Sequence, residues 1–137
     1  MRHGFPMVPL LLLALAAPGQ TGEPKVKKPR LDLRATPRIA MSPVNVLLVA
    51  ELVGGDEAED YYCPGLEWEW GDGGRSAHES DCPPFEPGVE MARRFSAMHA
   101  YNRPGDYQVT VRLRRADRSL AAASASITVR GLSASFE

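Results

Sequence analysis

Apolar and polar residues alternate along three segments of the chain, at residues 66–70, 107–115 and 121–130. A period of two places successive side chains on opposite faces of a β-strand, so each segment predicts a strand with one buried face. The apolar face of the first segment consists of Leu66, Trp68 and Trp70, which include both tryptophans of the protein. These two tryptophans are therefore expected in the core, directly before the turn-like sequence "GDGG".

Several other segments also predict strands. The apolar run at residues 44–52 is typical of a strand that is covered on both faces or lies near the centre of a sheet. Residues 38–43 predict a short edge strand that Pro43 interrupts, and the polar residues 115–119 predict a hairpin between their flanking strands. Residues 90–101 have a weak helical spacing and are assigned as a strand or an irregular segment. Together the segments predict an all-β, antiparallel β-sandwich.

The N-terminus predicts export. Residues 1–19 begin with a basic Arg2 and contain an apolar run at residues 8–17, which is typical of a cleaved signal peptide. That run is too short to span a bilayer, which takes roughly 20 apolar residues, although an uncleaved anchor is the alternative. We expect a basic, Pro-containing linker at residues 20–34, the folded domain at 35–131 and a tail at 132–137. The expected location is outside the cell or in the periplasm or cell envelope, without insertion in a membrane.

Cys63 and Cys82 are the only cysteines. Because exported proteins meet an oxidising environment, the pair predicts one disulfide, with two free thiols as the alternative. Closing a loop of this length stabilises a domain by about 3 kcal/mol. The sequence has no CxxC motif, which argues against a zinc ribbon or a thioredoxin-type redox site.

Charge is distributed unevenly along the chain. Residues 51–90 contain twelve acidic residues and a single basic residue, Arg75, whereas residues 91–137 contain eight arginines and three acidic residues. This asymmetry suits a module that docks a partner through one charged end, or a mixed surface that is biased only in sequence. Nucleic-acid binding is not expected, because the domain is not basic overall.

Three features resemble catalytic or metal-binding elements. Gly71, Asp72 and Gly73 are better explained as a strand-ending turn than as a catalytic or metal loop. His99 is expected to brace a neighbouring loop together with Tyr101 instead of acting as a general base. Glu67 and Glu69 share a strand face, about 7 Å apart, close to the spacings of glycosidase carboxylates. A solvated strand face offers no desolvation that would raise one pKa, so we predict no catalysis there.

Two loops are candidates for binding. The acidic residues Asp56, Glu57, Glu59 and Asp60 offer oxygen ligands of the kind that Ca²⁺ takes, or form a solvated acidic turn. No other cofactor is expected. Tyr61, Tyr62 and Phe85 lie near the cysteines and are the candidate contact surface, since Tyr is enriched where modules bind partners. The alternative is that these rings pack around the disulfide.

Two stretches, "WEWGDGG" at residues 68–74 and "HAYNRPGDYQVTVRL" at residues 99–113, resemble the paired signatures of the PKD (polycystic kidney disease) domain family. The first set of positions is Trp68, Glu69, Trp70, Gly71, Asp72 and Gly73. The second is His99, Tyr101, Gly105, Tyr107, Val109 and Val111. The resemblance covers about residues 33–130. Glu69 and Trp70 depart from the usual Asp and Phe, and the stretch between Gly73 and His99 is longer than typical.

The resemblance implies an Ig-like sandwich found in secreted and cell-surface proteins, which usually acts as a non-catalytic spacer or as a protein- or glycan-binding module. We therefore expect a module that is not an enzyme and that binds or spaces outside the cell, with a protein or polysaccharide as partner. An accessory domain that works in trans with a secreted hydrolase, or a structural envelope component, is the alternative. The oligomeric state is left open.

Overall fold

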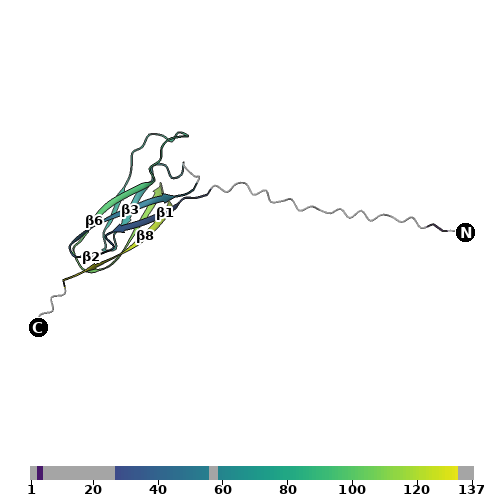
Figure 1. Cartoon of the computed structure of the whole chain (residues 1–137). Coiled ribbons are helices and arrows are strands. Elements are labelled where there is room, and N and C mark those ends of the chain that lie inside the picture. Colours follow the sequence, from purple (N-terminus) through teal and green to yellow (C-terminus); the bar gives the residue numbers. More distant parts are fainter. Residues whose placement is uncertain (1–2, 5–26, 56–58, 133–137) are drawn as a thin grey trace.

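Eight strands form two sheets in the part of the chain that the computed structural model describes, residues 3–4, 27–55 and 59–132 (Figure 1). The strands are β1 (Arg30–Thr36), β2 (Ile39–Met41), β3 (Val44–Val53), β4 (Gly65–Glu69), β5 (Arg75–His78), β6 (Arg94–Tyr101), β7 (Gly105–Arg115) and β8 (Arg118–Arg130). One sheet has three strands in the order β1-β3-β6, and the other has five in the order β2-β8-β7-β4-β5. The all-β, Ig-like sandwich is therefore confirmed.

Strand pairing agrees with most of the pattern read from the sequence. β7 and β8 form the predicted hairpin, and residues 94–101 form strand β6. The short edge strand before Pro43 is β2, which pairs with β8 in parallel, whereas every other strand pair of the described chain is antiparallel. Between β1 and β2 the chain passes from one sheet to the other, across a cis peptide bond before Pro37.

The core lies between the two sheets. Trp68 and Trp70 are each 4% exposed, and the inward residues of β7 and β8 are buried around them. The core residues with at most 1% exposure are Val46, Leu48, Ala50, Tyr101, Val109, Val111, Leu113 and Ile127. Alternation therefore identified the buried face of β4 and β7 correctly. Tyr107, expected in the core, is only half-buried at its edge.

β3 lies at the centre of the three-stranded sheet, as one of the two sequence-based alternatives stated. The other alternative, a strand covered on both faces, is wrong. Leu48 and Ala50 are buried, but Leu47 is 38% exposed because nothing in the described chain covers the outer face of this sheet. Leu47 is therefore an apolar residue on the open face of an antiparallel sheet. The continuous apolar run in the sequence did not indicate which of its residues would be exposed.

The folded domain begins before the expected boundary at residue 35. β1 starts at Arg30, and Leu31 is buried opposite Leu52 of β3. The last part of the expected linker is therefore the first strand. Residues 5–26 and 133–137 lie outside the described residues, and with them most of the expected signal peptide, part of the linker and most of the tail. In the described chain, no helix has the length and apolar character needed to cross a bilayer.

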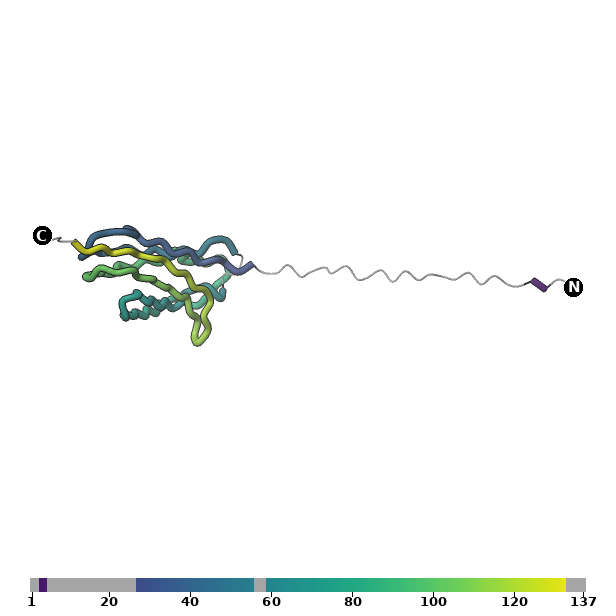
Figure 2. The backbone as a smooth tube through the Cα atoms, turned by 90° about the horizontal axis from the view of Figure 1, so that it is seen from below, coloured from purple at the N-terminus to yellow at the C-terminus, as the bar shows by residue number. Residues whose placement is uncertain are grey.

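The ends of the domain lie far apart. In Figure 2, β1 begins at one end of the long axis of the sandwich, and β8 ends at the opposite end. The chain therefore enters and leaves the domain along its long axis.

Candidate functional site

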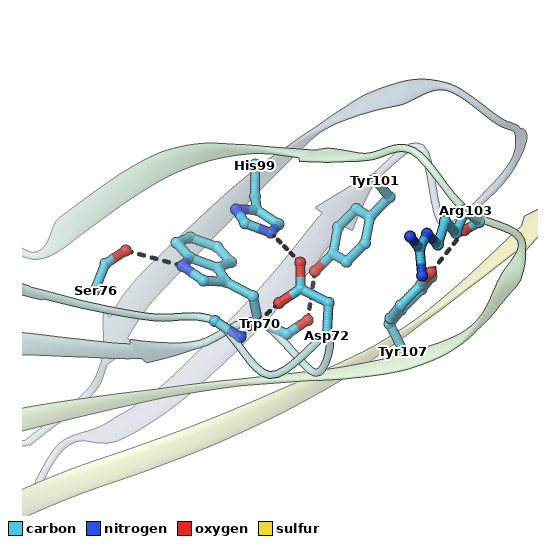
Figure 3. Close-up of polar contacts among 8 residues, drawn as sticks. Trp70, Asp72, Ser76, His99, Tyr101, Arg103 and Tyr107 are labelled. Atoms are coloured by element: carbon cyan, nitrogen blue, oxygen red, sulfur yellow. Dashed lines mark hydrogen bonds and ion pairs between the residues drawn. The ribbon is translucent and has the colours of Figure 1, made fainter.

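Aromatic and polar side chains gather where β4 leads into β5 (Figure 3). The Trp70 ring stacks on the His99 ring, with centroids 4.4 Å apart and planes within 1°. The Trp70 indole donates a hydrogen bond of 2.9 Å from Nε1 to Ser76 Oγ. His99 Nε2 lies 2.7 Å from Asp72 Oδ2. The cluster joins β6 of one sheet to the β4–β5 connection of the other.

Asp72 uses both carboxylate oxygens within this cluster. Oδ2 contacts His99, and Oδ1 accepts a 2.8 Å hydrogen bond from the Gly74 amide. Partial burial alone would raise the pKa of Asp72, but the hydrogen bonds from His99 and Gly74 outweigh it and hold that pKa below its ordinary value. The carboxylate is therefore ionised and fixed as a brace of the β4–β5 connection. Gly71 and Gly73 flank it with φ of +82° and +91°.

Two tyrosines complete the cluster. Tyr101 is 1% exposed, and its hydroxyl donates a 2.7 Å hydrogen bond to the carbonyl of Trp70. Burial raises the pKa of Tyr101 well above its ordinary value, so the hydroxyl stays protonated as a donor. Tyr107 lies 4.5 Å from Tyr101 between ring centroids and donates to the carbonyl of Arg103. These hydroxyls fasten the backbone at both ends of the cluster.

Glu67 and Glu69 differ from the expectation of a solvated face. Glu67 lies 3.1 Å from Arg114, and Glu69 lies 3.1 Å from Arg112 and 3.6 Å from Arg75. Each carboxylate is half-buried under these guanidinium groups. Each of the two carboxylates is therefore paired with an arginine of β7.

Cys63 and Cys82 form the predicted disulfide, with their Cα atoms 6.1 Å apart. A second contact runs parallel to it, because the Tyr62 hydroxyl donates a 2.6 Å hydrogen bond to the carbonyl of Pro83. The ring of Phe85 meets the ring of Tyr62 edge to face at 5.4 Å. Residues 79–93, here called the clamped loop, are therefore tied to the segment that precedes β4.

The three residues of the candidate contact surface differ in their exposure. Tyr61 is 2% exposed and belongs to the core, with its hydroxyl 3.3 Å from the carbonyl of Leu120, so its inclusion is wrong. Tyr62 and Phe85 are half-buried against each other and keep part of each ring at the surface. These two rings therefore pack against each other and remain partly accessible, and a contact surface at Tyr62 and Phe85 stays a prediction.

The acidic residues proposed for calcium fall into two groups. Asp56 and Glu57 lie outside the described residues. Asp60 lies 3.2 Å from Arg115 and 3.6 Å from Arg118, and the backbone carbonyl of Glu59 accepts a hydrogen bond from Arg115. In the described ranges, no three His, Cys, Asp or Glu side chains come together in a way that would hold a metal ion. The Asp60 carboxylate balances two arginines.

Part of the charge asymmetry of the sequence is neutralised by ion pairs in the fold. Acidic residues before and in β4 pair with arginines of β7 and β8, as the contacts of Asp60, Glu67 and Glu69 show. The acidic residues of the clamped loop are different: all are exposed and form no ion pair with another described residue. They are Glu79, Asp81, Glu86 and Glu90.

A groove of about 530 Å³ lies beside the clamp. Its walls include Cys63 of the disulfide, the Glu67–Arg114 ion pair, His78 at the end of β5 and Glu79 at the start of the clamped loop. The sequence analysis did not select His78 or Arg114 as site residues. Only the β4–β7 and β4–β5 registers bring them together, since Leu66 lies opposite both Leu113 and His78.

Comparison with solved structures shows which known domains have a similar fold. The PKD domain of an M14-like peptidase from a Thermoplasmatales archaeon superposes with a TM-score of 0.53 at 13% identity, over 76% of this chain and 97% of that domain. The fold is that of a PKD domain. A CARDB domain from Pyrococcus furiosus, solved in complex with di-metal ions, gives a TM-score of 0.46 at 5% identity over 76% of this chain and 94% of that one. No protein-family model matches the sequence, and no curated protein does.

Within this PKD-like fold, the two sequence signatures meet in space. Trp70 and Asp72 of the first contact His99 and Tyr101 of the second. The signatures therefore encode one bridge between the two sheets. The clamped loop lies between the two signatures in sequence and belongs to neither.

Proposed function

We propose that the chain is an exported, non-catalytic PKD-like module that binds a protein partner through the clamped loop. The observation that carries this proposal is the double tether of the loop, by the Cys63–Cys82 disulfide and the Tyr62–Pro83 hydrogen bond. A loop that carries several prolines and two tethers loses little conformational entropy on binding. Binding residues of a rigid scaffold are commonly placed on such loops.

The chemistry of the loop favours a basic protein surface as the partner. Phe85 and Tyr62 supply a rigid aromatic pair, and aromatic residues are enriched at the centre of protein interfaces. The acidic residues of the clamped loop stand on both sides of Phe85 in the sequence, are exposed, and have no cationic partner in the described chain. Complementary positive charge would speed the encounter and fix the orientation. A polysaccharide is the alternative ligand, and it gains less from these carboxylates.

The proposed absence of catalysis is supported by the polar side chains near β4, which are bonded to other residues of the protein. Asp72 and His99 are held against each other and against Trp70, and the Ser76 hydroxyl accepts the indole N–H. Glu67 and Glu69 are paired with arginines. Asp72, His99 and Ser76, as well as the two glutamates, therefore each have a structural partner.

A spacer role is compatible with binding and has its own support. The chain enters and leaves at opposite ends of the sandwich (Figure 2), so the domain would hold the segments before and after it apart. Export is supported by the disulfide, because such bonds persist in oxidising compartments. Fractionation of the source cells, followed by a thiol assay on the recovered protein, tests export. Cytosolic protein with two reactive thiols would contradict it.

A capture experiment tests the binding proposal. The oxidised chain is immobilised and exposed to native envelope extract or medium, and the captured material is identified and then titrated directly. Phe85→Ala and the double charge reversal Asp81→Lys/Glu86→Lys should each weaken the interaction by about tenfold or more. Ile39→Ala, at a residue that is 63% exposed on β2, is the matched control and should have no effect.

The outcome distinguishes the alternatives. A polysaccharide that is captured equally well by wild type and by the charge reversal would show that the partner class is wrong. Capture of a protein that survives both the Phe85 and the charge variants would show that the clamped loop is not the binding surface.

A further inference from the structure

β6 forms an open edge of the three-stranded sheet. It pairs with β3 along one side, and its other side has no neighbouring strand in the described chain (Figure 1). An exposed edge presents backbone N–H and C=O groups that can pair with another strand.

The hydrogen-bond pattern shows which residues of β6 face this edge. The Leu52 amide donates a 2.8 Å hydrogen bond to the Arg93 carbonyl, and these two residues continue the register that pairs Ala50 with Phe95. In an antiparallel ladder every second residue directs both backbone groups to the partner strand, and the residues between them direct theirs away. The residues that face the open edge are therefore Arg94, Ser96, Met98 and Ala100.

The same residues point their side chains to the outer face of the sheet. Met98 is 63% exposed and lies opposite Leu47 of β3, which is 38% exposed. Free backbone groups and an exposed apolar pair thus occupy the same place on the molecule. This is the combination that strand addition uses, with backbone hydrogen bonds for affinity and side-chain contacts for selectivity.

The other sheet edges of the described fold are protected. β2 has three residues and lies between Pro37 and Pro43, and β5 has four residues. β1 lies against β8 of the other sheet. β6 has eight residues. Its edge-facing residues Ser96, Met98 and Ala100 are uncharged, and the strand contains no proline and no bulge that would discourage pairing.

We propose that β6 pairs with β6 of a second copy of this chain, antiparallel about a two-fold axis at Met98. The two three-stranded sheets would then form one continuous sheet of six strands. In this register Met98 lies opposite Met98 of the second copy, and Ser96 lies opposite Ala100 of the second copy. All of these residues have edge-facing backbone groups, so each pair exchanges two hydrogen bonds.

A second copy suits this edge because the edge is self-complementary. The Leu47–Met98 pairs of the two copies would adjoin across the two-fold axis and shield each other from water, which a strand without such a pair would not achieve. The antiparallel register also places the two Arg94 side chains at opposite ends of the new strand pair. A parallel register would bring these like charges together, which is unfavourable.

Sedimentation velocity on a dilution series of the purified chain tests the dimer. Wild type should show a monomer–dimer equilibrium that shifts with concentration. Met98→Lys places two like charges opposite each other, and Met98→Pro removes an amide that faces the open edge. Each should raise the dimer dissociation constant by at least about tenfold. Met41→Lys adds the same charge at a residue of β2 that is 47% exposed and should leave the equilibrium unchanged.

Amide hydrogen exchange locates the contact without any substitution. Raising the concentration should slow exchange at Ser96, Met98 and Ala100, while Ala97 and His99, which bond to β3, stay protected at every concentration. A chain that is monomeric throughout would overturn the proposal. So would a dimer in which the Met98 amide exchanges as fast as in the monomer, or protection of β6 that requires a different protein. Because the clamped loop is not part of this contact, none of these results bears on the proposed function.

Discussion

His99 on β6 and Asp72 between β4 and β5 lie 2.7 Å apart, 27 residues apart in sequence, and join the two sheets of the sandwich. The contact is held from both sides, since Trp70 stacks on the His99 ring and the Gly74 amide bonds Asp72. A pair that resembles catalytic machinery in sequence is thus a structural bridge.

Stability should depend on the charge of Asp72. Its folded-state pKa is lowered below the ordinary 3.8, so the unfolded chain binds the proton more readily. The stabilisation is therefore fully present above the ordinary value and is lost as the pH falls through the folded pKa. Asp72→Asn should lower the melting temperature at neutral pH, and the difference from wild type should shrink on acidification. Asp81→Asn controls for net charge, and a difference that persists unchanged in acid would contradict this role.

Gly71 should tolerate substitution far less well than Gly73. Both have positive φ, +82° and +91°, but a Cβ on Gly71 would lie 2.6 Å from the Gln108 carbonyl oxygen, whereas a Cβ on Gly73 would meet nothing within 4 Å. Gly73→Ala should cost about 1 kcal/mol from backbone strain alone. Gly71→Ala should cost more than about 2 kcal/mol, because strand β7 would have to move. Urea denaturation measures both, and equal losses would show that the contact with β7 is unimportant.

The ion pairs between β4 and β7 should contribute little to stability. Glu67 and Arg114 are about 40% and 34% exposed in their side chains, and their charges are screened by water and salt. Glu67→Gln should lower the free energy of unfolding by less than about 1 kcal/mol, with a smaller effect at high salt. A double-mutant cycle with Arg114→Gln isolates the pair. A coupling well above that value would mean that this ladder is a main support of the sheet.

Removal of the disulfide should destabilise the domain without unfolding it. The double substitution Cys63→Ser/Cys82→Ser frees a loop with a sequence separation of 19, and the expected loss is about 3 kcal/mol. Such a loss is smaller than the total stability of most domains of this kind, roughly 5–15 kcal/mol. Denaturation of wild type with and without reductant should give the same difference as the double variant. No change under reduction would show that the clamp does not restrain the unfolded chain.

Alternation predicted the strands well because the sandwich buries one face of each sheet. Trp68, Val109 and Val111 were assigned to the core by period alone, and they lie there. The same logic failed where apolar residues stand on an open face, as Leu47 does. Tyr61 was assigned to the contact surface for a different reason, the enrichment of Tyr where modules bind partners, and it lies in the core.

The contacts of the site that could not be predicted are those between residues far apart in sequence. The pairing of Glu67 and Glu69 with Arg114 and Arg112 depends on the β4–β7 register, which no local pattern specifies. The Tyr62–Pro83 hydrogen bond likewise depends on how the clamped loop folds back. The disulfide at this end of the molecule could be predicted from the sequence, because a pair of cysteines in an exported protein is expected to be oxidised.

The most direct test of the account compares capture by the oxidised chain with capture by the Cys63→Ser/Cys82→Ser variant, after near-ultraviolet circular dichroism has shown that Trp68 and Trp70 are packed in both. Tyr62→Phe, which removes only the hydrogen bond to Pro83, serves as a second variant that keeps the disulfide. The account predicts that loss of the disulfide weakens capture strongly and that loss of the hydroxyl weakens it to a smaller extent. Equal capture by all three chains would contradict the claim that the clamped loop is a pre-organised binding surface.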